Sequence, residues 1–382
     1  MHICFVNMPI EYYSPRTGGA ISTIIMQSAK ELLARGHRVT VLTVPGDDPG
    51  YSVGEVVSIE ARKKSDLNLV QRAFSKLAER RHGYDWPYFD FYLRSVIARL
   101  CEFRPDTIVL FNDLVSPGHI KPVIPNGKIF VWLQNEWRTR NTELEKCIAA
   151  TNRFLTCSRY IADWTAKEHG IPADKFVVAH SGVDLELFQP REDCLAPRDC
   201  IRALFIGRID RNKGPDIAVD AVRAMQLEGA NLSMTVAGGL WFYGHGREME
   251  DPYFRELHGK MELAGVDYAG HVDRDRAPAL IRQHDIAFVL SRSNEPFGLV
   301  VLECMASGLA VIASNRGGLP EAVGPAGTLV DPDDLDAVMD QVRRLVTVPA
   351  ALSEAKRSSL DWANRNGWSK CADVLERALA PS

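Results

Sequence analysis

Four short segments combine glycine with charged side chains in a way that suits a ligand carrying both phosphate and hydroxyl groups. Residues 207–214 read GRIDRNKG, residues 295–303 read EPFGLVVLE, residues 315–321 read NRGGLPE and residues 16–20 read RTGGA. Arginine and lysine bind phosphate oxygens, and glycine lets the main chain approach a ligand closely. Carboxylates accept hydrogen bonds from sugar hydroxyls, so both halves of such a ligand would find partners.

The first segment supplies two cations, Arg208 and Lys213, directly after an expected strand at 202–206. Open α/β sheets bind ligands at the carboxyl ends of their strands, which is where this loop would lie. Arg208 and Lys213 are therefore candidate ligands of a diphosphate. The alternative is a solvated basic turn without a ligand.

The second segment places two carboxylates, Glu295 and Glu303, eight residues apart around an expected helix start. The first turn of a helix has free N–H groups that favour an anion. Two carboxylates would repel that anion unless they bind hydroxyl groups of the same ligand instead. The alternative is that Glu303 is a salt-bridging helix residue and Glu295 an exposed loop charge.

The elements that must position these segments alternate between strand and helix in both halves of the chain. A helix is expected at 19–35, from apolar residues at helical spacing. The expected strands are 3–7, 38–44, 107–111, 129–133 and 154–157, then 202–206, 232–237, 286–290, 310–313 and 327–330. This order predicts an α/β fold with two Rossmann-like parallel-sheet domains.

The length of 382 residues also favours two domains over one. Residues 184–202 lack periodicity and are interpreted as the linker. The first predicted domain is 1–183, an acceptor-binding domain completed by residues 360–382, whose helices cross back to it. The second is 184–359, a nucleotide-sugar-binding domain.

Composition excludes several other classes of protein. Lys plus Arg is 45 and Asp plus Glu is 49, which gives a net charge of -4 and no basic excess for nucleic acid. The eight cysteines have no metal-ligand spacing, and buried free thiols in a reducing compartment are expected. No stretch is long enough to span a membrane, so we expect a cytoplasmic location. Peripheral binding to the inner face of the membrane is the alternative within that expectation.

Together the segments resemble the retaining glycosyltransferase family 4, whose members have the GT-B fold. Residues 295–323, EPFGLVVLECMASGLAVIASNRGGLPEAV, are similar to the family pattern throughout, and Glu295 and Glu303 match its Glu-x7-Glu signature. The resemblance implies that Glu303 binds the ribose hydroxyls and that Glu295 contacts the transferred sugar. Arg208 and Lys213 then bind the diphosphate, and Glu295, Arg208 and Lys213 form the catalytic set.

The resemblance also implies the rest of the donor site and the reaction. Main-chain amides of Gly19, Phe297, Gly298, Leu299 and Val300 would bind phosphate and sugar. The co-substrate is a nucleotide-sugar, with a UDP-sugar expected by family frequency and GDP second. No cofactor and no metal ion are expected. The reaction would be hexosyl or N-acetylhexosaminyl transfer by front-face displacement with retention.

The first half departs from the family pattern where a histidine is common. Asn112 and Gln134 stand there instead, and both can bind a sugar hydroxyl. Tyr13 and Arg16 are further candidate contacts of the acceptor, which is a glycan, a lipid-linked molecule or a small metabolite. Two other classes stay open: a nucleotide-sugar epimerase, and a non-catalytic nucleotide-sugar-binding subunit, which the missing histidine favours.

A basic stretch at 76–81 precedes the aromatic-rich residues 82–89, HGYDWPYF. Such a pairing could seat the protein on an anionic membrane. A solvated charged surface beside core aromatics is the alternative, and charge runs favour it.

Overall fold

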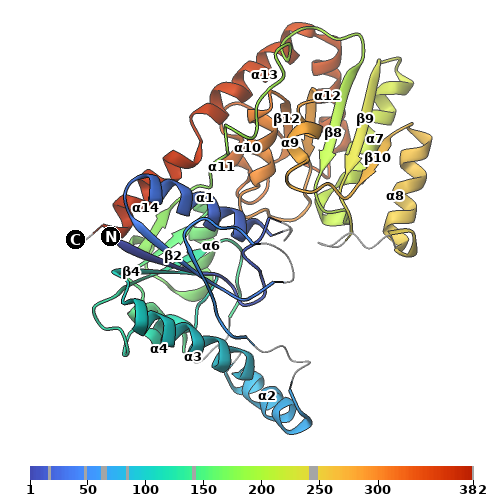
Figure 1. Cartoon of the computed structure of the whole chain (residues 1–382). Helices are drawn as coiled ribbons and strands as arrows, with labels where there is room; N and C mark the ends of the chain where they lie inside the picture. Colours follow the sequence, from blue (N-terminus) through green and yellow to red (C-terminus); the bar gives the residue numbers. More distant parts are fainter. Residues whose placement is uncertain are drawn as a thin grey trace. The chain divides into compact units, whose positions relative to one another are not determined.

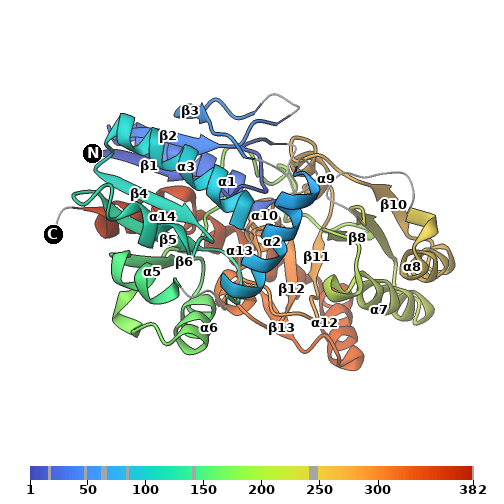
Figure 2. The same ribbon diagram turned by 90° about the horizontal axis from the view of Figure 1, so that it is seen from below.

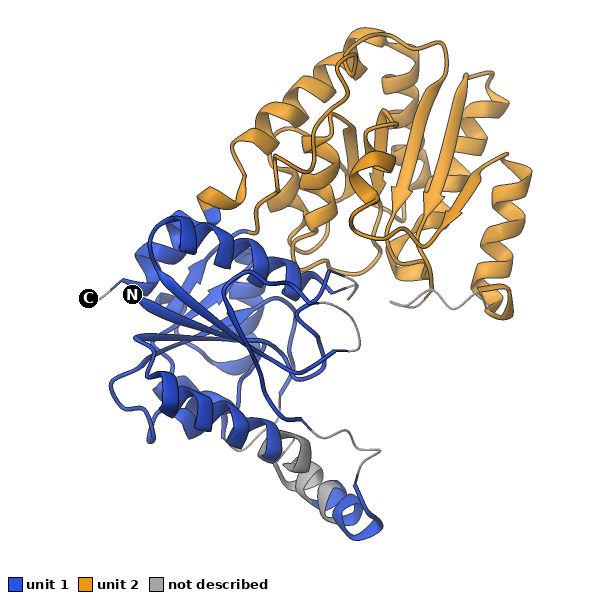
Figure 3. Ribbon diagram, viewed as in Figure 1, with its two compact units in different colours: residues 1–180, 371–382 blue, residues 181–370 orange. Residues whose placement is uncertain are grey.

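The computed structural model describes residues 1–15, 19–46, 50–61, 67–82, 86–139, 143–240 and 248–380. The chain forms two compact units, which Figure 3 shows in blue and orange. Unit 1 comprises residues 1–180 and 371–382, and unit 2 comprises residues 181–370. Residues from Cys371 onward thus belong to the unit that the N-terminus begins.

The sheet of unit 1 is parallel throughout, in the strand order β3-β2-β1-β4-β5-β6-β7. Its strands are β1 (His2–Val6), β2 (Arg38–Thr43), β3 (Glu55–Ser58), β4 (Thr107–Phe111), β5 (Lys128–Leu133), β6 (Arg153–Thr156) and β7 (Phe176–Val178). Parallel strands need crossover connections, and here these are mostly helices.

Helices cover both faces of this sheet. Figure 1 shows α1 (Ala20–Ala34) and α14 (Trp368–Leu379) on one face, and α3 (Trp86–Phe103) and α4 (Ser116–Ile120) on the other. The remaining helices of the unit are α2 (Leu69–His82), α5 (Leu144–Ala150) and α6 (Arg159–His169). Alternate strand residues pack against α3 because successive side chains of a strand point to opposite faces. This core contains Cys4, Val6, Ile108, Leu110, Tyr92, Val96 and Leu100.

The sheet of unit 2 is also parallel, in the order β10-β9-β8-β11-β12-β13. Its strands are β8 (Ile201–Ile206), β9 (Leu232–Ala237), β10 (Asp267–Gly270), β11 (Ile286–Val289), β12 (Ala310–Ser314) and β13 (Thr328–Val330). The strand order reverses between β8 and β11, as it does between β1 and β4 in unit 1. Such switch points are where open α/β sheets bind ligands.

One face of the second sheet packs against α7 (Pro215–Leu227), α8 (Pro252–Leu263) and α12 (Leu335–Thr347). Helices α7 and α12 lie side by side (Figure 2). The helices α10 (Leu299–Ala306) and α11 (Leu319–Val323) contact β12 but contribute nothing to that core, so they cover the opposite face. The helices α9 (Ala277–Ile281) and α13 (Pro349–Asn364) complete the unit.

A buried ion pair fastens α13 to the amino end of β11. Lys356 Nζ lies 2.6 Å from Asp285 Oδ1, and the two side chains are 3% and 1% exposed. Asp285 also accepts hydrogen bonds from Arg191 at 3.2 Å and from the main-chain N–H of Arg202 at 3.0 Å. Lys356 further donates to the Cys194 carbonyl at 2.9 Å, so the pair also holds the main chain that precedes β8.

The predicted fold class, two Rossmann-like parallel-sheet domains, is confirmed. The edge strands β3, β7 and β10 were not predicted. These strands are half-exposed or exposed over most of their length, so they lack the apolar run that marks a central strand. In the described ranges no helix combines the length and hydropathy needed to cross a bilayer.

Candidate functional site

Two of the predicted segments meet at the switch point of unit 2. The loop at 207–214 follows β8 and the loop at 290–298 follows β11, and these strands are neighbours. Lys213 Nζ lies 2.5 Å from Glu295 Oε1, with the side chains 30% and 12% exposed. Ser291 donates a hydrogen bond to the same carboxylate oxygen at 2.7 Å. The structure thus brings together two predicted site residues that are 82 positions apart.

Arg208 is positioned by a turn that its own loop builds. Asp210 accepts hydrogen bonds from the main-chain N–H groups of Asn212 and Lys213, which starts a short 3-10 helix. The other carboxylate oxygen of Asp210 lies 2.5 Å from Arg208 Nε. Arg208 remains 42% exposed, so its guanidinium is accessible to a ligand.

Glycine is required where these loops touch. At Gly214 the φ angle is 69°, and a Cβ atom would lie 2.1 Å from the Leu290 carbonyl oxygen. At Gly317 the φ angle is 61°, and a Cβ atom would lie 2.3 Å from the Glu295 carbonyl oxygen. Gly318 N–H donates to that same oxygen at 2.6 Å. The third segment therefore holds the main chain of Glu295 in place.

Helix α10 begins at this site, and its N-cap residue provides no side-chain cap for the main-chain N–H groups of the first turn. Its N-cap is Gly298, at a φ angle of 95°, a residue that has no side chain to accept a hydrogen bond from the first turn. Leu299 and Val300 open the helix, while Phe297 is buried beneath the loop. Free amides at a helix N-terminus suit an anion, as predicted for the donor phosphate.

Glu303 lies one turn into α10 and is ion-paired. Its Oε1 atom lies 2.7 Å from Nη2 of Arg274, which comes from the loop between β10 and α9. The Arg274 guanidinium also stands 5.9 Å from the ring centre of Phe188. The structure thus shows Glu303 in a salt bridge, as the alternative expected, while its role toward ribose stays a prediction.

Arg292 forms hydrogen bonds with three loops of the site, and it was not among the predicted site residues. Its guanidinium makes two hydrogen bonds to Asp216, at 2.8 and 2.7 Å, and one to the Arg211 carbonyl at 2.8 Å. Its main-chain N–H donates to Asn212, and its carbonyl accepts from Arg316. The signal available in the sequence was its position, two residues beyond an expected strand.

The Arg292–Asp216 contact also sets the charge state of the carboxylate. Burial acts to raise the pKa of Asp216, but hydrogen bonds from Arg292 and Tyr253 outweigh it, so the pKa lies below its usual range. The hydrogen bonds that Arg292 donates to Asp216 raise the pKa of Arg292. Both groups are therefore charged at neutral pH, and the link between the loops is ionic.

Two neutral side chains, Asn112 and Gln134, stand at the carboxyl ends of β4 and β5 in unit 1. Asn112 has a φ angle of 48°, is buried, and accepts a hydrogen bond from the Gln134 main-chain N–H at 2.7 Å. It therefore fixes the end of β5. The Gln134 side chain is also buried, and its Nε2 atom has no hydrogen-bond partner among the described residues.

The other predicted contacts of unit 1 lie in different surroundings. Tyr13 is buried and donates to the Val53 carbonyl at 3.1 Å. Gly19 is the N-cap of α1, where the Glu11 carboxylate accepts from the Ser22 N–H at 2.9 Å. Burial raises the pKa of Glu11. Arg16 lies outside the described residues, as do residues 83–85 of the aromatic segment.

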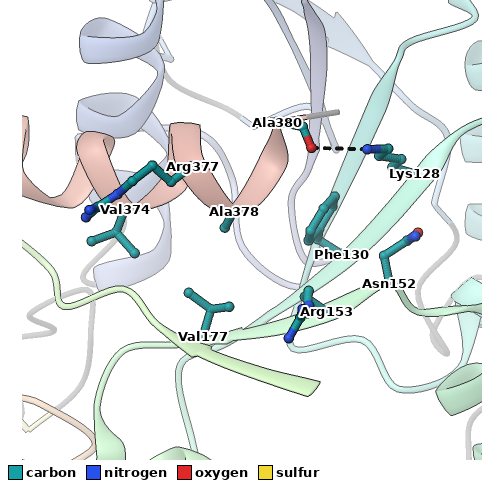
Figure 4. Close-up of a pocket in the computed structure, with 9 residues that line it drawn as sticks. All are labelled: Lys128, Phe130, Asn152, Arg153, Val177, Val374, Arg377, Ala378 and Ala380. Atoms are coloured by element: carbon teal, nitrogen blue, oxygen red, sulfur yellow. Dashed lines mark hydrogen bonds between the residues drawn. The ribbon is translucent and has the colours of Figure 1, made fainter. Parts of the chain in front are cut away.

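A pocket of about 550 Å³ in unit 1 contains none of the predicted residues. It lies between α14 and the amino ends of β5 and β6, so it opens at the opposite edge of the sheet from Asn112 and Gln134. Figure 4 shows Lys128 bonded there to the Ala380 carbonyl, with the Arg377 side chain directed away from Lys128. This pocket is therefore no part of the candidate donor site, which lies at the carboxyl edge of the sheet in unit 2.

Family profiles match both halves of the chain. The family described as "Glycosyltransferase Family 4" matches residues 18–187, and "Glycosyl transferases group 1" matches residues 191–361. The second match contains Arg208, Lys213, Glu295 and Glu303.

Three similar proteins cover nearly the whole chain. Spore coat protein SA of Bacillus subtilis (strain 168) is 26% identical, covering 94% of this chain and 93% of its own. The D-inositol 3-phosphate glycosyltransferase of Saccharomonospora viridis is 27% identical, covering 96% and 90%. The structure of Anabaena Alr3699/HepE in complex with UDP and glucose superposes with a TM-score of 0.71 at 17% identity, covering 99% and 98%.

Proposed function

Because the chain belongs to the family-4 glycosyltransferases and has their GT-B type of fold, we propose that it transfers a sugar from a UDP-sugar to an acceptor hydroxyl, with retention and without a metal ion. The observation that carries this proposal is the convergence of Lys213 and Glu295 at the switch point of unit 2. A cation and a carboxylate side by side suit a ligand whose phosphate and sugar are adjacent.

In this proposal Arg208 and Lys213 bind the oxygens of the diphosphate. Each is paired with a carboxylate, Arg208 with Asp210 and Lys213 with Glu295. Both cations are also partly exposed, so they can reach a ligand. Stabilising the negative charge that develops on a leaving group in a preorganised site is commonly a large catalytic contribution. This basic pair would do the work of a metal ion, and no cofactor is proposed.

In this proposal Glu295 and Glu303 accept hydrogen bonds from the hydroxyl groups of the donor. Glu303 accepts from the ribose hydroxyls, which requires its carboxylate to share or exchange the contact with Arg274. Glu295 accepts from hydroxyls of the transferred sugar, and Lys213 and Ser291 hold its carboxylate in place. The unmasked amides at the start of α10 add hydrogen bonds to the phosphate.

The reaction exchanges one bond for another on a single face of the sugar. The bond between the anomeric carbon and the diphosphate oxygen breaks, and its electron pair leaves with the diphosphate. The acceptor oxygen attacks the face that the diphosphate leaves, and its proton passes to the departing phosphate oxygen. Retention follows because the leaving and entering oxygens occupy the same face.

The nature of the donor and acceptor rests on separate observations. The choice of UDP is supported by the relative whose structure holds UDP and glucose. The unpartnered amide of Gln134 in unit 1 supports an acceptor with hydroxyl groups, because a buried amide nitrogen is costly to leave without a hydrogen bond. Hexosyl or N-acetylhexosaminyl transfer is the proposed reaction.

Calorimetric titration of UDP, GDP and ADP into the wild-type protein and into Glu303→Ala tests the donor site. We expect UDP to bind most tightly and to lose most of its affinity in the variant. Glu228→Ala is the matched control, because Glu228 is also paired with an arginine, Arg343, at 2.8 Å. Equal binding to both variants, or no binding to folded wild-type protein, would contradict the assignment of Glu303.

The stereochemistry and the metal requirement are tested on product. With a UDP-sugar and an acceptor found by screening, proton NMR of the anomeric centre should show the configuration of the donor. Turnover should be unchanged by a chelator. An inverted product, or activity that a chelator removes and a divalent cation restores, would contradict the corresponding part of the proposal.

A further inference from the structure

Helix α2 exposes three large aliphatic side chains to solvent. Leu69, Val70 and Leu77 are 83%, 65% and 63% exposed. Among the described residues, only Ile10, Leu227 and Leu263 are large apolar side chains of comparable exposure, and each of these stands on a different element. Isolated exposed leucines are ordinary on a protein surface, whereas a cluster on one helix marks an interaction surface.

The three side chains lie on one side of the helix. Residues four apart in a helix are neighbours on its surface, so Leu69, Ala73 and Leu77 form a stripe, and Val70 flanks it. The helix start is fixed by two reciprocal hydrogen bonds, from Gln71 N–H to the Asn68 side chain and from Asn68 N–H to the Gln71 side chain. We call Leu69, Val70, Ala73 and Leu77 the α2 stripe.

The same helix carries a concentration of positive charge. Its sequence, LVQRAFSKLAERRH, contains four Arg or Lys residues and one Glu, in a chain whose net charge is -4. Lys76 precedes Leu77 and is exposed. Arg72 is exposed as well, and its Nε atom donates a hydrogen bond to the Leu67 carbonyl at 2.9 Å. Among the described side chains of α2, the basic Arg72 and Lys76 are therefore exposed together with the aliphatic Leu69 and Leu77.

We propose that α2 docks this protein onto the surface of an anionic lipid bilayer, with the α2 stripe in the interface and the basic side chains at the headgroups. Helices that lie in a membrane plane combine an apolar stripe with Lys and Arg in this way. Anionic leaflets attract such basic segments. A symmetric contact between two copies through α2 would bring like positive charges together, whereas an anionic lipid surface attracts them, so the lipid surface is the occupant that the charge favours.

The apolar residues that would contact the membrane in this proposal differ from those that the sequence indicated. The aromatic-rich residues 82–89 were the expected apolar partner of the basic stretch, but residues 83–85 lie outside the described part of the chain. The exposed aliphatic residues at the start and middle of α2 carry the proposal instead. It is independent of the charged donor-site residues Arg208, Lys213, Glu295 and Glu303, which lie in unit 2.

Vesicle flotation with the full chain tests the proposal. One set of vesicles is phosphatidylcholine alone, and the other contains equal parts of phosphatidylcholine and phosphatidylglycerol. We expect binding to the anionic vesicles, little binding to the neutral ones, and weakening as salt is raised, because salt screens the attraction between charges.

Three variants locate the surface. The double variant Leu69→Gln, Leu77→Gln should lower the partition coefficient about tenfold or more, since each leucine loses the burial of several methylene groups. Lys76→Glu should lower binding to anionic vesicles only. The matched control is Leu227→Gln, Leu263→Gln, which removes two equally exposed leucines from unit 2 and should bind as the wild type does.

Circular dichroism and the thermal unfolding midpoint, compared with those of the wild type, show whether each variant is folded. Wild-type protein that binds neither vesicle, or both equally, would overturn the proposal. Equal loss in the control variant would do the same. Wild-type dimers that the Leu69→Gln, Leu77→Gln variant abolishes, without lipid binding, would assign the α2 stripe to a contact between copies of the chain.

Discussion

Two lysine–carboxylate pairs in unit 2 have nearly the same length and opposite surroundings. Lys213 and Glu295 meet at 2.5 Å at the carboxyl edge of the sheet, where the lysine is 30% exposed. Lys356 and Asp285 meet at 2.6 Å at the amino end of β11, where both side chains are almost fully buried. The first pair lies between two loops, and the second joins a helix to the start of a strand.

The difference shows how burial and additional partners separate a binding site from a structural contact. Asp285 accepts hydrogen bonds from three groups besides contacting Arg198, so its charge is fully satisfied inside the protein. Burial acts to raise the pKa of Asp285, but these partners outweigh it and hold the pKa below its usual range. The Lys213–Glu295 pair is partly exposed to solvent, so a charged ligand can reach Lys213 and take the place of Glu295 as its partner.

The largest expected effect is on the buried pair. Asp285→Asn should lower the free energy of unfolding by about 3–5 kcal/mol, because it leaves a buried lysine without its counter-charge. Lys356→Met should cost less, since Asp285 retains Arg191 and the Arg202 N–H. Denaturant unfolding monitored by circular dichroism measures both. An unchanged midpoint for Asp285→Asn would show that the pair has no structural role.

The exposed pair should behave in the opposite way. Lys213→Met should lower kcat/KM by about 10²- to 10³-fold, because it removes a preorganised charge from the leaving group. Its unfolding midpoint should change little, as partly exposed pairs contribute little to stability. Lys260→Met is the matched control, since Lys260 is 31% exposed and lies 2.6 Å from Asp220 on neighbouring helices. Equal activity of both variants would remove Lys213 from the site.

Arg292 joins these loops, so a change there should give an intermediate effect. Arg292→Lys cannot make both hydrogen bonds to Asp216, and we expect kcat to fall about 10- to 100-fold through misplaced loops, with a smaller change in donor KM. In a Lys213→Met background the further loss should be much smaller, because Arg292 is expected to act by holding the loop that carries Lys213.

Arg343→Lys is the control for that experiment, since Arg343 also makes two hydrogen bonds to one carboxylate, that of Glu228. Steady-state kinetics of the three single variants and the double variant measures the coupling. Fully additive losses would mean that Arg292 does not act through the Lys213 loop.

The smallest expected effect is on the pH dependence of stability, through Asp216. The pKa of Asp216 is depressed in the folded protein, so its contribution to stability is present above the unfolded pKa of about 3.9 and is lost as pH falls through the folded value. Stability of the wild type should therefore fall on acidification below that range. Asp216→Asn should be less stable at neutral pH but should lose less on acidification. An identical pH dependence in both proteins would contradict this role.

Much of the site could be predicted because its parts are local in sequence. The turn that carries Arg208 and Lys213 and the helix start between Glu295 and Glu303 each follow a central strand, and central strands are recognisable apolar runs. The edge strand β10, from whose loop Arg274 comes, lacks such a run and was missed. Arg292 and Asp216 were missed for another reason, because their partners lie 76 residues apart.

The sequence by itself determined the two parallel-sheet units, the order of the donor-site segments and the family to which they belong. Only the tertiary structure decided which charges meet: Lys213 with Glu295, Arg274 with Glu303 and Lys356 with Asp285. It also placed Tyr13 and Asn112 in the interior of unit 1. The physical reason is that strand and helix patterns depend on neighbouring residues, whereas ion pairing and burial depend on which strands lie side by side.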